Sequence, residues 1–550
     1  MISRILNLRC RARKTIKKGF WVPIVFGAAA FSLSTLAGQE SEGREWLTPE
    51  PVDHQMVALI REEGFQRSQV IEKLSYMTDV LGARLTNSKD MKRAQSWLVQ
   101  ELESMGLSNT RKDPFMEYGV SWDNVGFSLD MLEPDYQPMV GFPLAHTPGT
   151  SGSVELPVMI ADVKHKSDLS KFQGKLKGTA VLSSPPPTVD LERFSKGTPR
   201  RTESELKAMD EEVLQQPVDL EAHFKTLYPE PKGESGLLTP VERLRFFEKE
   251  GVALILESNS GWPGAVRGFA RPGAKIDRWS QEATLRSVPI VAVTPEHYNR
   301  MYRLLLRGIP VHVEAEVENR HGETVEFAHN IIAEIPGVEY PDQIVMMGAH
   351  FDTWHASPNA SDNTSGVVVM LEAMRILKEL DIQPKRTIRV VFWGGEEQGL
   401  YGSRAYVQKN YIDGNNMHSE PVKGSAYDNF SVYFNQDYGP GEYRGIYLQG
   451  NEHVRGIFRS WMKPLEDLGM KTISIQGVGS TDHIPFDEIG LPAFQFLQAR
   501  TGGTGGHTNL DFFDTIPIED LMKNAVIMAS FVYHSAMRDE ILPRKKLGSN

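Results

Sequence analysis

The sequence contains a single cysteine among 550 residues, Cys10, and it lies in an N-terminal segment that we expect to be removed. Without thiols, the remaining chain forms no disulfide, has no cysteine nucleophile and offers no thiolate to a metal ion. Any metal must therefore be bound by His, Asp and Glu side chains. This excludes disulfide scaffolds, cysteine hydrolases and cysteine-based zinc modules.

The chain also lacks basic runs after its first 37 residues. Residues 1–37 carry seven bases and no acid, so the other 513 residues hold 53 bases against 71 acids. No basic stripe remains to follow a phosphate backbone, and we predict no nucleic-acid partner. The composition, 40% hydrophobic and 24% charged, is that of an ordinary globular protein and excludes a collagen, a coiled coil or a multi-span membrane protein.

The N-terminal segment has the order of a secretory signal peptide. A basic stretch precedes an apolar run from Phe20 to Leu36, and small residues follow at the junction with Gly38. We therefore predict a signal peptide over 1–37 and a secreted or periplasmic protein with no stable membrane association after cleavage. The alternative is an uncleaved anchor, because the run just spans a bilayer if Pro23 is tolerated.

Beyond the signal, the character of the sequence changes twice. Residues 49–110 place apolar side chains at helical spacing, whereas residues 136–325 contain short β-rich runs separated by turns. From Asn330 onward, strand-like runs alternate with helical stretches. This alternation predicts an α/β fold with a mostly parallel, mixed sheet flanked by helices, and a β-rich module inserted before it.

Seven acidic or imidazole side chains follow four predicted strands. Three come after residues 344–347, two after 388–393, one after 430–434, and the last lies in a glycine-rich loop beyond 491–496. In open α/β sheets ligands bind beyond the carboxyl ends of the strands, so these groups are expected to converge on one crevice. The seven side chains are His350, Asp352, Asp362, Glu396, Glu397, Asp437 and His507.

Five of these side chains form a ligand set of nitrogen and oxygen atoms. Such a set suits zinc or another first-row divalent ion with positions left open for water. A carboxylate shared by two ions, with two further ligands for each, is the pattern of a co-catalytic pair, and we predict two zinc ions per chain. The predicted metal ligands are His350, Asp362, Glu397, Asp437 and His507.

The other two carboxylates have predicted supporting roles. Asp352 is placed to accept the second imidazole N–H of His350, which would fix the tautomer of that ligand. Adjacent glutamates at a strand end project in different directions, so one binds metal while the other stays free as a general base. Two further histidines compete as ligands. His355 is not at a strand end, and for His483 we favour a hydrogen-bonding or packing role.

These motifs resemble those of the di-zinc exopeptidases of the aminopeptidase Y type, and most closely the carboxypeptidase Q-like enzymes. The resemblance covers residues 74–115 and 330–533, although the family often has a second Asp where this chain has Asn363. The motifs that carry it are Gly348–Trp354, Ser361–Val367, Phe392–Ser403, Thr481–His483, Gly490–Phe496 and His507–Asp511.

The resemblance implies a role for each matching position. One zinc is bound by His350, Asp362 and Asp437. The other is bound by Asp362, Glu397 and His507. The implied catalytic residues are Glu396, as general base, and Asp352, behind His350. Trp354 either lines the crevice or packs beneath it.

The resemblance also divides the chain. It implies a zinc-exopeptidase fold whose middle module is similar to a protease-associated domain. We predict a signal peptide (1–37), an N-terminal part of the catalytic domain (38–135), the protease-associated-like insert (136–325) and the main catalytic metallopeptidase domain (326–550). The long stretch 185–250 and the glycine-rich 498–506 depart from the family pattern, and both lie where substrate reach would be set.

We therefore expect an exported, zinc-dependent exopeptidase. It would hydrolyse the bond next to a free terminus of short peptides or dipeptides through a metal-bridging hydroxide, with Glu396 moving the proton. The alternatives are a single-zinc enzyme like the glutaminyl cyclases and a non-catalytic binding protein like the transferrin receptors. The sequence leaves open the oligomeric state and whether the amino or the carboxyl end is recognised. Carboxylate capture requires a nearby Arg, for which Arg500 is a candidate by position.

Overall fold

The computed structural model describes most of the chain after the predicted signal peptide, which itself lies outside the described residues. None of the described helices combines the length and the apolarity needed to span a bilayer. The described residues are 50–192, 199–213, 236–277, 279–413, 422–501 and 505–545.

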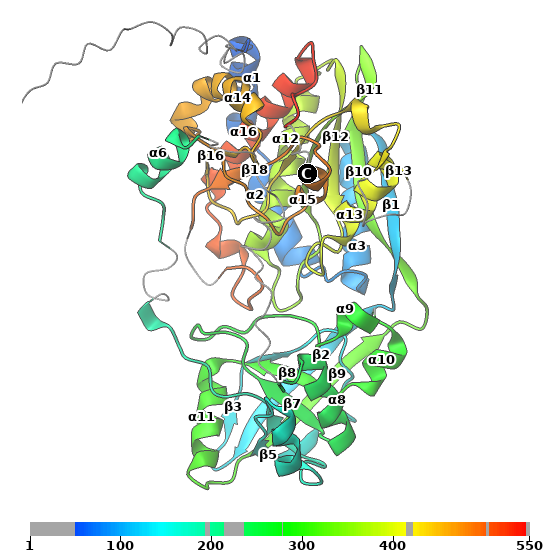
Figure 1. Ribbon diagram of the computed structural model, residues 1–550, viewed down its shortest axis with the longest axis vertical. Coiled ribbons are helices and arrows are strands. Elements are labelled where there is room, and N and C mark those ends of the chain that lie inside the picture. The colour runs from blue at the N-terminus through cyan, green and yellow to red at the C-terminus, as the bar shows by residue number, and fades with distance from the viewer. Residues whose placement is uncertain are drawn as a thin grey trace, which may run out of the picture. The chain divides into compact units, whose positions relative to one another are not determined.

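An eight-stranded mixed sheet carries the predicted site (Figure 1). Its four central strands, β12, β11, β15 and β18, run parallel, whereas β1, β10 and β16 each run antiparallel to a neighbour. This confirms the predicted α/β class. In sheet order the strands are β1 (Ser108–Gly119), β10 (Glu326–Ile335), β12 (Arg386–Trp393), β11 (Tyr340–His350), β15 (Phe430–Asn435), β18 (Ala493–Gln498), β16 (Tyr443–Tyr447) and β17 (Thr472–Ser474).

The register of the central strands brings their carboxyl ends to one level. His350, the last residue of β11, lies opposite Trp393, the last residue of β12. On the other side of β11, Gly348 lies opposite Asn435 at the end of β15. The residues that follow these three strands therefore start from one edge of the sheet, as the sequence pattern predicts.

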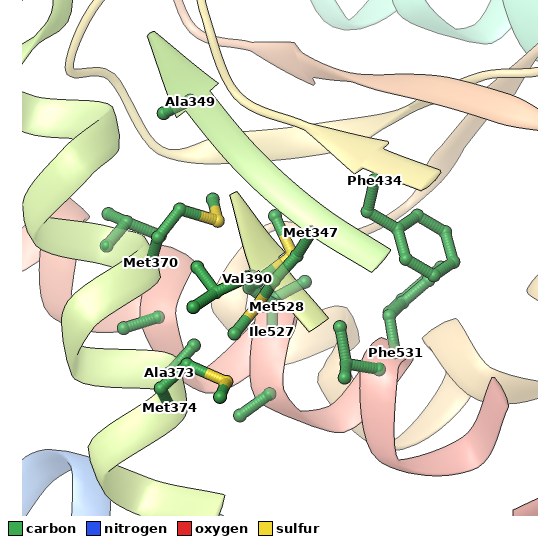
Figure 2. Close-up of a cluster of buried hydrophobic side chains, with 14 of the residues drawn as sticks. Met347, Ala349, Met370, Ala373, Met374, Val390, Phe434, Ile527, Met528 and Phe531 are labelled. Carbon is green, nitrogen blue, oxygen red and sulfur yellow. The ribbon is translucent and has the colours of Figure 1, made fainter. Parts of the chain in front are cut away.

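Apolar helices cover both faces of this sheet. One face is covered by α1 (His54–Gln66), α2 (Val70–Ser75), α3 (Lys89–Ser104), α12 (Ser365–Glu379), α14 (Arg455–Met462) and α16 (Ile518–Met537). The opposite face is covered by α13 (Tyr401–Tyr411) and α15 (Ile484–Glu488). Figure 2 shows α12 and α16 packed against β11, β12 and β15 through Met347, Ala349, Met370, Ala373, Met374, Val390, Phe434, Ile527, Met528 and Phe531.

Helix α12 is buried on all sides over most of its length, and it carries an ion-pair cluster into the core. The Arg375 side chain is 6% exposed and contacts Glu63 of α1 at 2.6 Å and Glu372 of α12 at 2.7 Å. A buried arginine is tolerated because both carboxylates neutralise it and accept its hydrogen bonds. The cluster therefore joins two helices that pack on the same face of the sheet.

A second eight-stranded sheet forms the insert. Strand β2 pairs with β9 along most of its length, so the predicted boundary at residue 136 would split this sheet. We therefore move the boundary to the turn between β1 and β2, and the division into domains otherwise stays a prediction. The sheet order is β3 (Gln137–Pro138), β2 (Trp122–Glu133), β9 (His312–His321), β5 (Val154–Ile160), β6 (Ala180–Leu182), β7 (Leu254–Glu257), β8 (Ile290–Val293) and β4 (Gly141–Pro143).

Two long helices of the insert pack on opposite faces of its sheet. Helix α11 (Pro295–Leu306) packs on one face through Tyr298 and Met301, and α8 (Pro240–Glu250) packs on the other through Leu244 and Phe247. Helix α6 (Glu203–Glu211) instead contacts β17 of the first sheet. The remaining short elements are α4 (Leu169–Phe172), α9 (Ala274–Asp277), α10 (Gln281–Arg286), β13 (Ile412–Asp413) and β14 (Val422–Lys423).

Candidate metal centre

The predicted ligands meet at the carboxyl edge of the first sheet. The His350 side chain ends β11 and is 1% exposed. Glu396 and Glu397 follow β12, and Asp437 follows β15 by two residues. Asp362 lies in the irregular turn between β11 and α12, where its φ and ψ angles are not helical. Strand ends therefore supply most of the groups, as predicted.

Asp362 lies between two groups of ligands. One oxygen, Oδ1, is 3.2 Å from Nε2 of His350, and that nitrogen is 3.4 Å from Oδ1 of Asp437. The other oxygen, Oδ2, is 3.1 Å from Nε2 of His507, which is 2.9 Å from Oε2 of Glu397. One carboxylate thus presents a separate oxygen to each of two histidines, which is the arrangement of a bridging ligand.

The contacts of Asp352 differ from the predicted ones. The main-chain carbonyl of Asp352, not its carboxylate, accepts the Nδ1–H of His350 at 2.9 Å, while its Oδ1 lies 3.9 Å from that nitrogen. Because a carbonyl only accepts, this bond places the proton on Nδ1 and leaves the Nε2 lone pair free for a metal. Asp352 lies beside His350, as its position two residues further along the chain predicted. The prediction that its carboxylate accepts the N–H of His350 was wrong, because the main-chain carbonyl does so.

The carboxylate of Asp352 instead organises the two glutamates. It accepts the main-chain N–H of Glu396 at 3.1 Å and that of Glu397 at 3.3 Å. The hydroxyl of Thr86 donates a third bond to it at 3.0 Å. Asp352 is fully buried, so these bonds compensate for the loss of solvent around its charge. Asp352 therefore holds both the predicted base and its neighbouring ligand in place.

Burial and mutual repulsion dominate the electrostatics of the site. Burial raises the pKa of Glu396 well above its ordinary value, with a further increase from the charge of Asp437. Burial likewise raises the pKa of Glu397 to about 7. Burial alone would lower the pKa of His507, but Asp362 and Glu397 outweigh it and raise that pKa to about 11. The crowded carboxylates thus favour any cation placed among them.

The donor atoms fit divalent cations. Two groups of donor atoms each lie within 4.8 Å of one another, namely those of His350, Glu396 and Asp437 and those of His350, Asp362 and Glu397. Oε1 of Glu397 is buried and accepts no hydrogen bond among the described residues, so a buried lone pair is left for a metal. An all-nitrogen-and-oxygen set of this kind matches the chemistry of zinc.

Two buried side chains that the sequence analysis gave no role hold the ligand loops. Arg84 is fully buried, and its guanidinium donates to the carbonyl of Phe351 at 2.8 Å and to the hydroxyl of Thr364 at 2.7 Å. Asp511 accepts the main-chain N–H of Ser361 at 2.8 Å and its hydroxyl at 2.7 Å. Asp511 belongs to the motif His507–Asp511, and this match was the only feature of the sequence that pointed to a role for it.

Another buried side chain to which the sequence analysis gave no role lies near the site. Asp482, in the motif Thr481–His483, has no exposed surface, and burial raises the pKa of its carboxyl group to about 8. The neighbouring His483 is also fully buried, and its Nε2 donates to the carbonyl of Val478 at 3.1 Å. This agrees with the predicted hydrogen-bonding role of His483.

The other open sequence questions concern neighbours of the ligands. His355 donates from Nε2 to the carbonyl of Pro143 at 2.7 Å and belongs to neither group of metal-binding atoms. Trp354 is 6% exposed and packs with Leu85 and Trp122, so it supports the crevice from below. Where the family often has a second Asp, Asn363 donates to the carbonyl of Gln436 and accepts the N–H of Gly366. An amide serves both contacts, whereas a carboxylate would serve only the second.

The insert holds the loop of the last ligand. The main-chain N–H of Gly268 donates to the carbonyl of His507 at 2.9 Å, and Phe269 packs edge-on against the His507 ring at 5.5 Å. Two residues further on, Asn509 bonds to Val266 through both main-chain and side-chain atoms. His507 itself has a φ of +65°, a strained value for a non-glycine residue that these contacts maintain.

The ligands open into a cleft of about 880 Å³. Its lining includes the ligands Asp362, Asp437 and His507 and the predicted base Glu396. A cleft of this size accepts a small molecule or a short peptide. Lys275 of α9, in the insert, also lines it, so the insert contributes to its walls.

Comparison with known proteins agrees with this geometry. Residues 330–532 match the family model of Peptidase family M28. Carboxypeptidase Q from Homo sapiens is 24% identical over 484 residues, covering 88% of each chain. Because that alignment is nearly full-length, it includes the insert as well as the metal centre.

Solved structures share the fold. A peptidase M28 precursor from Shewanella amazonensis SB2B superposes with a TM-score of 0.62 at 20% identity, covering 90% of this chain and 99% of that one. BSAP, a zinc aminopeptidase from Bacillus subtilis, gives a TM-score of 0.51 at 19% identity, covering 86% and 95%. The relatives are exopeptidases, in agreement with the predicted hydrolase. Residues 330–532 thus match Peptidase family M28, and the chain is similar to the zinc exopeptidases of the aminopeptidase Y and carboxypeptidase Q type, which confirms the predicted resemblance.

Proposed function

We propose that this protein is a zinc-dependent exopeptidase that cleaves the bond next to a free terminus of short peptides. The observation that carries this proposal is the position of Asp362, whose two oxygens face two separate pairs of ligands at 3.1–3.2 Å from their histidines. A single-metal site needs no such shared carboxylate. The cleft above it has room for a short peptide.

The residues divide into two proposed metal sites. His350, Asp362 and Asp437 would hold one zinc ion, and Asp362, Glu397 and His507 would hold the other. When bound, a pair of zinc ions supplies an activated water molecule and polarises the scissile carbonyl group. All five ligands required for this arrangement are present.

Glu396 is the proposed general base. Glu396 lines the cleft and is 9% exposed, and its pKa is raised. A raised pKa makes a carboxylate a stronger base, which favours proton transfer from a water molecule. A carboxylate oxygen of Glu396 takes a proton from the attacking water and then delivers it to the nitrogen of the leaving amine. The bond from its main-chain N–H to the carboxylate of Asp352 holds the backbone of Glu396 at this position.

The complete ligand set favours the peptidase over the two alternatives. An enzyme like the glutaminyl cyclases would use one zinc, and a binding protein like the transferrin receptors would need no ligands. Neither alternative accounts for a carboxylate placed between two histidines. We also propose export by the N-terminal signal, a secreted or periplasmic location, a protease-associated role for the insert and peptide as the principal partner.

Metal removal and readdition test the proposal. The purified protein should contain two zinc ions per chain by elemental analysis and should hydrolyse dipeptides. Chelation should abolish that hydrolysis, and added zinc should restore it. A protein that holds both zinc ions and hydrolyses no member of a dipeptide panel would refute the peptidase. One zinc per chain together with cyclisation of N-terminal glutamine would favour the cyclase.

A further inference from the structure

A second cavity adjoins the metal cleft. It has a volume of about 550 Å³ and shares Tyr438 and Ser480 with the cleft. Tyr438 directly follows the predicted ligand Asp437, so the second cavity begins one residue from the metal centre. Because the two cavities share these lining residues, a peptide bound in the metal cleft can extend along them into the second cavity.

The charge of this cavity is opposite to that of the metal centre. Its described lining includes two arginines, Arg201 and Arg500, and no Asp or Glu. Arg500 is exposed and forms no ion pair within the described part of the chain, while Arg201 donates to the hydroxyl of Tyr447 at 3.1 Å. Glu205, whose charge interacts with both arginines, lies outside this lining, and its carboxylate accepts the N–H and the hydroxyl of Thr202.

Arg201 is held at the cavity by helix α6, although it belongs to the long stretch within the insert. Figure 1 shows α6 beside β16 and α14, and its Leu206 is buried in a cluster with Tyr447 and Leu497. Asp210 at the other end of α6 contacts Arg459 at 2.5 Å and accepts the main-chain N–H of Ile473 at 2.7 Å. The helix is therefore docked by both apolar and ionic contacts.

We propose that this basic side cavity binds a carboxylate of the substrate through Arg500 and Arg201. The proposal rests on the proposed peptidase function and adds to it the recognised end of the peptide. Guanidinium groups bind carboxylates through paired, charge-assisted hydrogen bonds, and Arg500 has its donors available for them. With the carboxylates of the metal centre on one side and two arginines on the other, a peptide is oriented with its acidic end away from the metals.

Two groups of a short peptide supply this chemistry. One is the carboxylate at the free carboxyl terminus, and the other is an acidic side chain just beyond the scissile bond. Three substrates separate them, namely Ala-Leu, Ala-Leu amide and Ala-Glu amide. The first carries only a terminal carboxylate, the second carries none, and the third carries only a side-chain carboxylate.

The experiment compares these substrates in the wild-type enzyme and in Arg500→Gln. A charge-assisted hydrogen bond corresponds to about 10- to 100-fold in binding, so KM for the recognised substrate should rise by that factor while kcat stays unchanged. KM for Ala-Leu amide should not change. A rise for Ala-Leu alone assigns the terminal carboxylate, and a rise for Ala-Glu amide alone assigns the side chain. Equal KM values for all three substrates, unaltered by the substitution, would overturn the proposal.

Matched variants exclude indirect effects. Arg201→Gln should raise the same KM value, whereas Arg286→Gln, at an exposed arginine paired with Glu282 elsewhere in the insert, should not. Arg500→Glu should weaken carboxylate binding more than Arg500→Gln does. Zinc content should equal that of the wild type in every variant, since none of these residues is a ligand.

A binding measurement keeps this inference separate from the proposed function. Calorimetric titration of the metal-free protein with N-acetylleucine and with N-acetylleucine amide needs no catalysis. Preferential binding of the acid, lost in Arg500→Gln, supports the side cavity even if no peptide is hydrolysed. Equal binding of acid and amide overturns it, even if the protein proves to be an active peptidase.

Discussion

Replacing Glu396 by glutamine tests proton transfer separately from metal binding. Glutamine keeps the size of the side chain, and the main-chain N–H bond to Asp352 remains, so the site keeps its shape. The amide accepts no proton at neutral pH. Loss of a general base costs roughly 10²–10⁴-fold in rate, equivalent to about 3–5 kcal/mol of transition-state stabilisation. The loss should appear in kcat, with KM and zinc content unchanged.

The neighbouring residue provides the matched comparison. Oε2 of Glu397 is 2.9 Å from Nε2 of His507, so Glu397→Gln removes one negative ligand from that metal site. Zinc content should fall along with activity, and excess zinc should restore part of the activity. Steady-state kinetics and elemental analysis of both variants show which glutamate binds zinc and which one transfers the proton. If Glu396→Gln loses zinc while Glu397→Gln keeps it, the two roles are exchanged. Near-full activity of Glu396→Gln would refute the mechanism.

Three further predictions concern stability and site assembly. Arg375→Met leaves the buried Glu372 without its arginine partner, while Glu63 keeps its ion pair with Arg67. The substitution should lower the free energy of unfolding by about 3–5 kcal/mol, measured by urea denaturation; a change below about 1 kcal/mol would show that the cluster is solvated. Burial raises the pKa of Glu257 to about 7, so its neutral form is favoured in the folded protein and stability decreases as pH rises from 4.5 to 7. Glu257→Gln should therefore be more stable than the wild type at pH 8, by up to about 3 kcal/mol, and equally stable at pH 4. Asn509→Ala removes the side-chain bond to Val266 and should lower zinc occupancy at the His507 site; wild-type zinc content in this variant would show that the insert does not hold that loop.

The sequence was most informative where local periodicity and chemistry coincide. Strand-like runs that end in His350, Glu396 or Asp437 predict a common edge, because parallel strands with covering helices place their carboxyl ends together. These inferences depend on neighbours along the chain, and the structure agrees with them.

The predictions that failed concern the orientation of a residue's polar groups or contacts between residues far apart in the sequence. Spacing placed Asp352 beside His350, but it does not show whether the carbonyl or the carboxylate faces the ring. The domain boundary at residue 136 was wrong by one strand, since the alternating pattern of β2 is weak and its partner β9 lies nearly 200 residues away. Nothing local indicates that α6 leaves the insert to pack on the first sheet.

The contacts of the His507 loop tie the last predicted ligand to a part of the chain that is synthesised before all the others. The insert precedes His350, Asp362, Glu397 and Asp437 in the sequence, and His507 follows them. Because Gly268 and Phe269 of the insert contact His507, the fifth ligand reaches its place only when the C-terminal region packs against a segment made much earlier. A complete candidate metal centre therefore requires that both regions of the polypeptide have folded and docked.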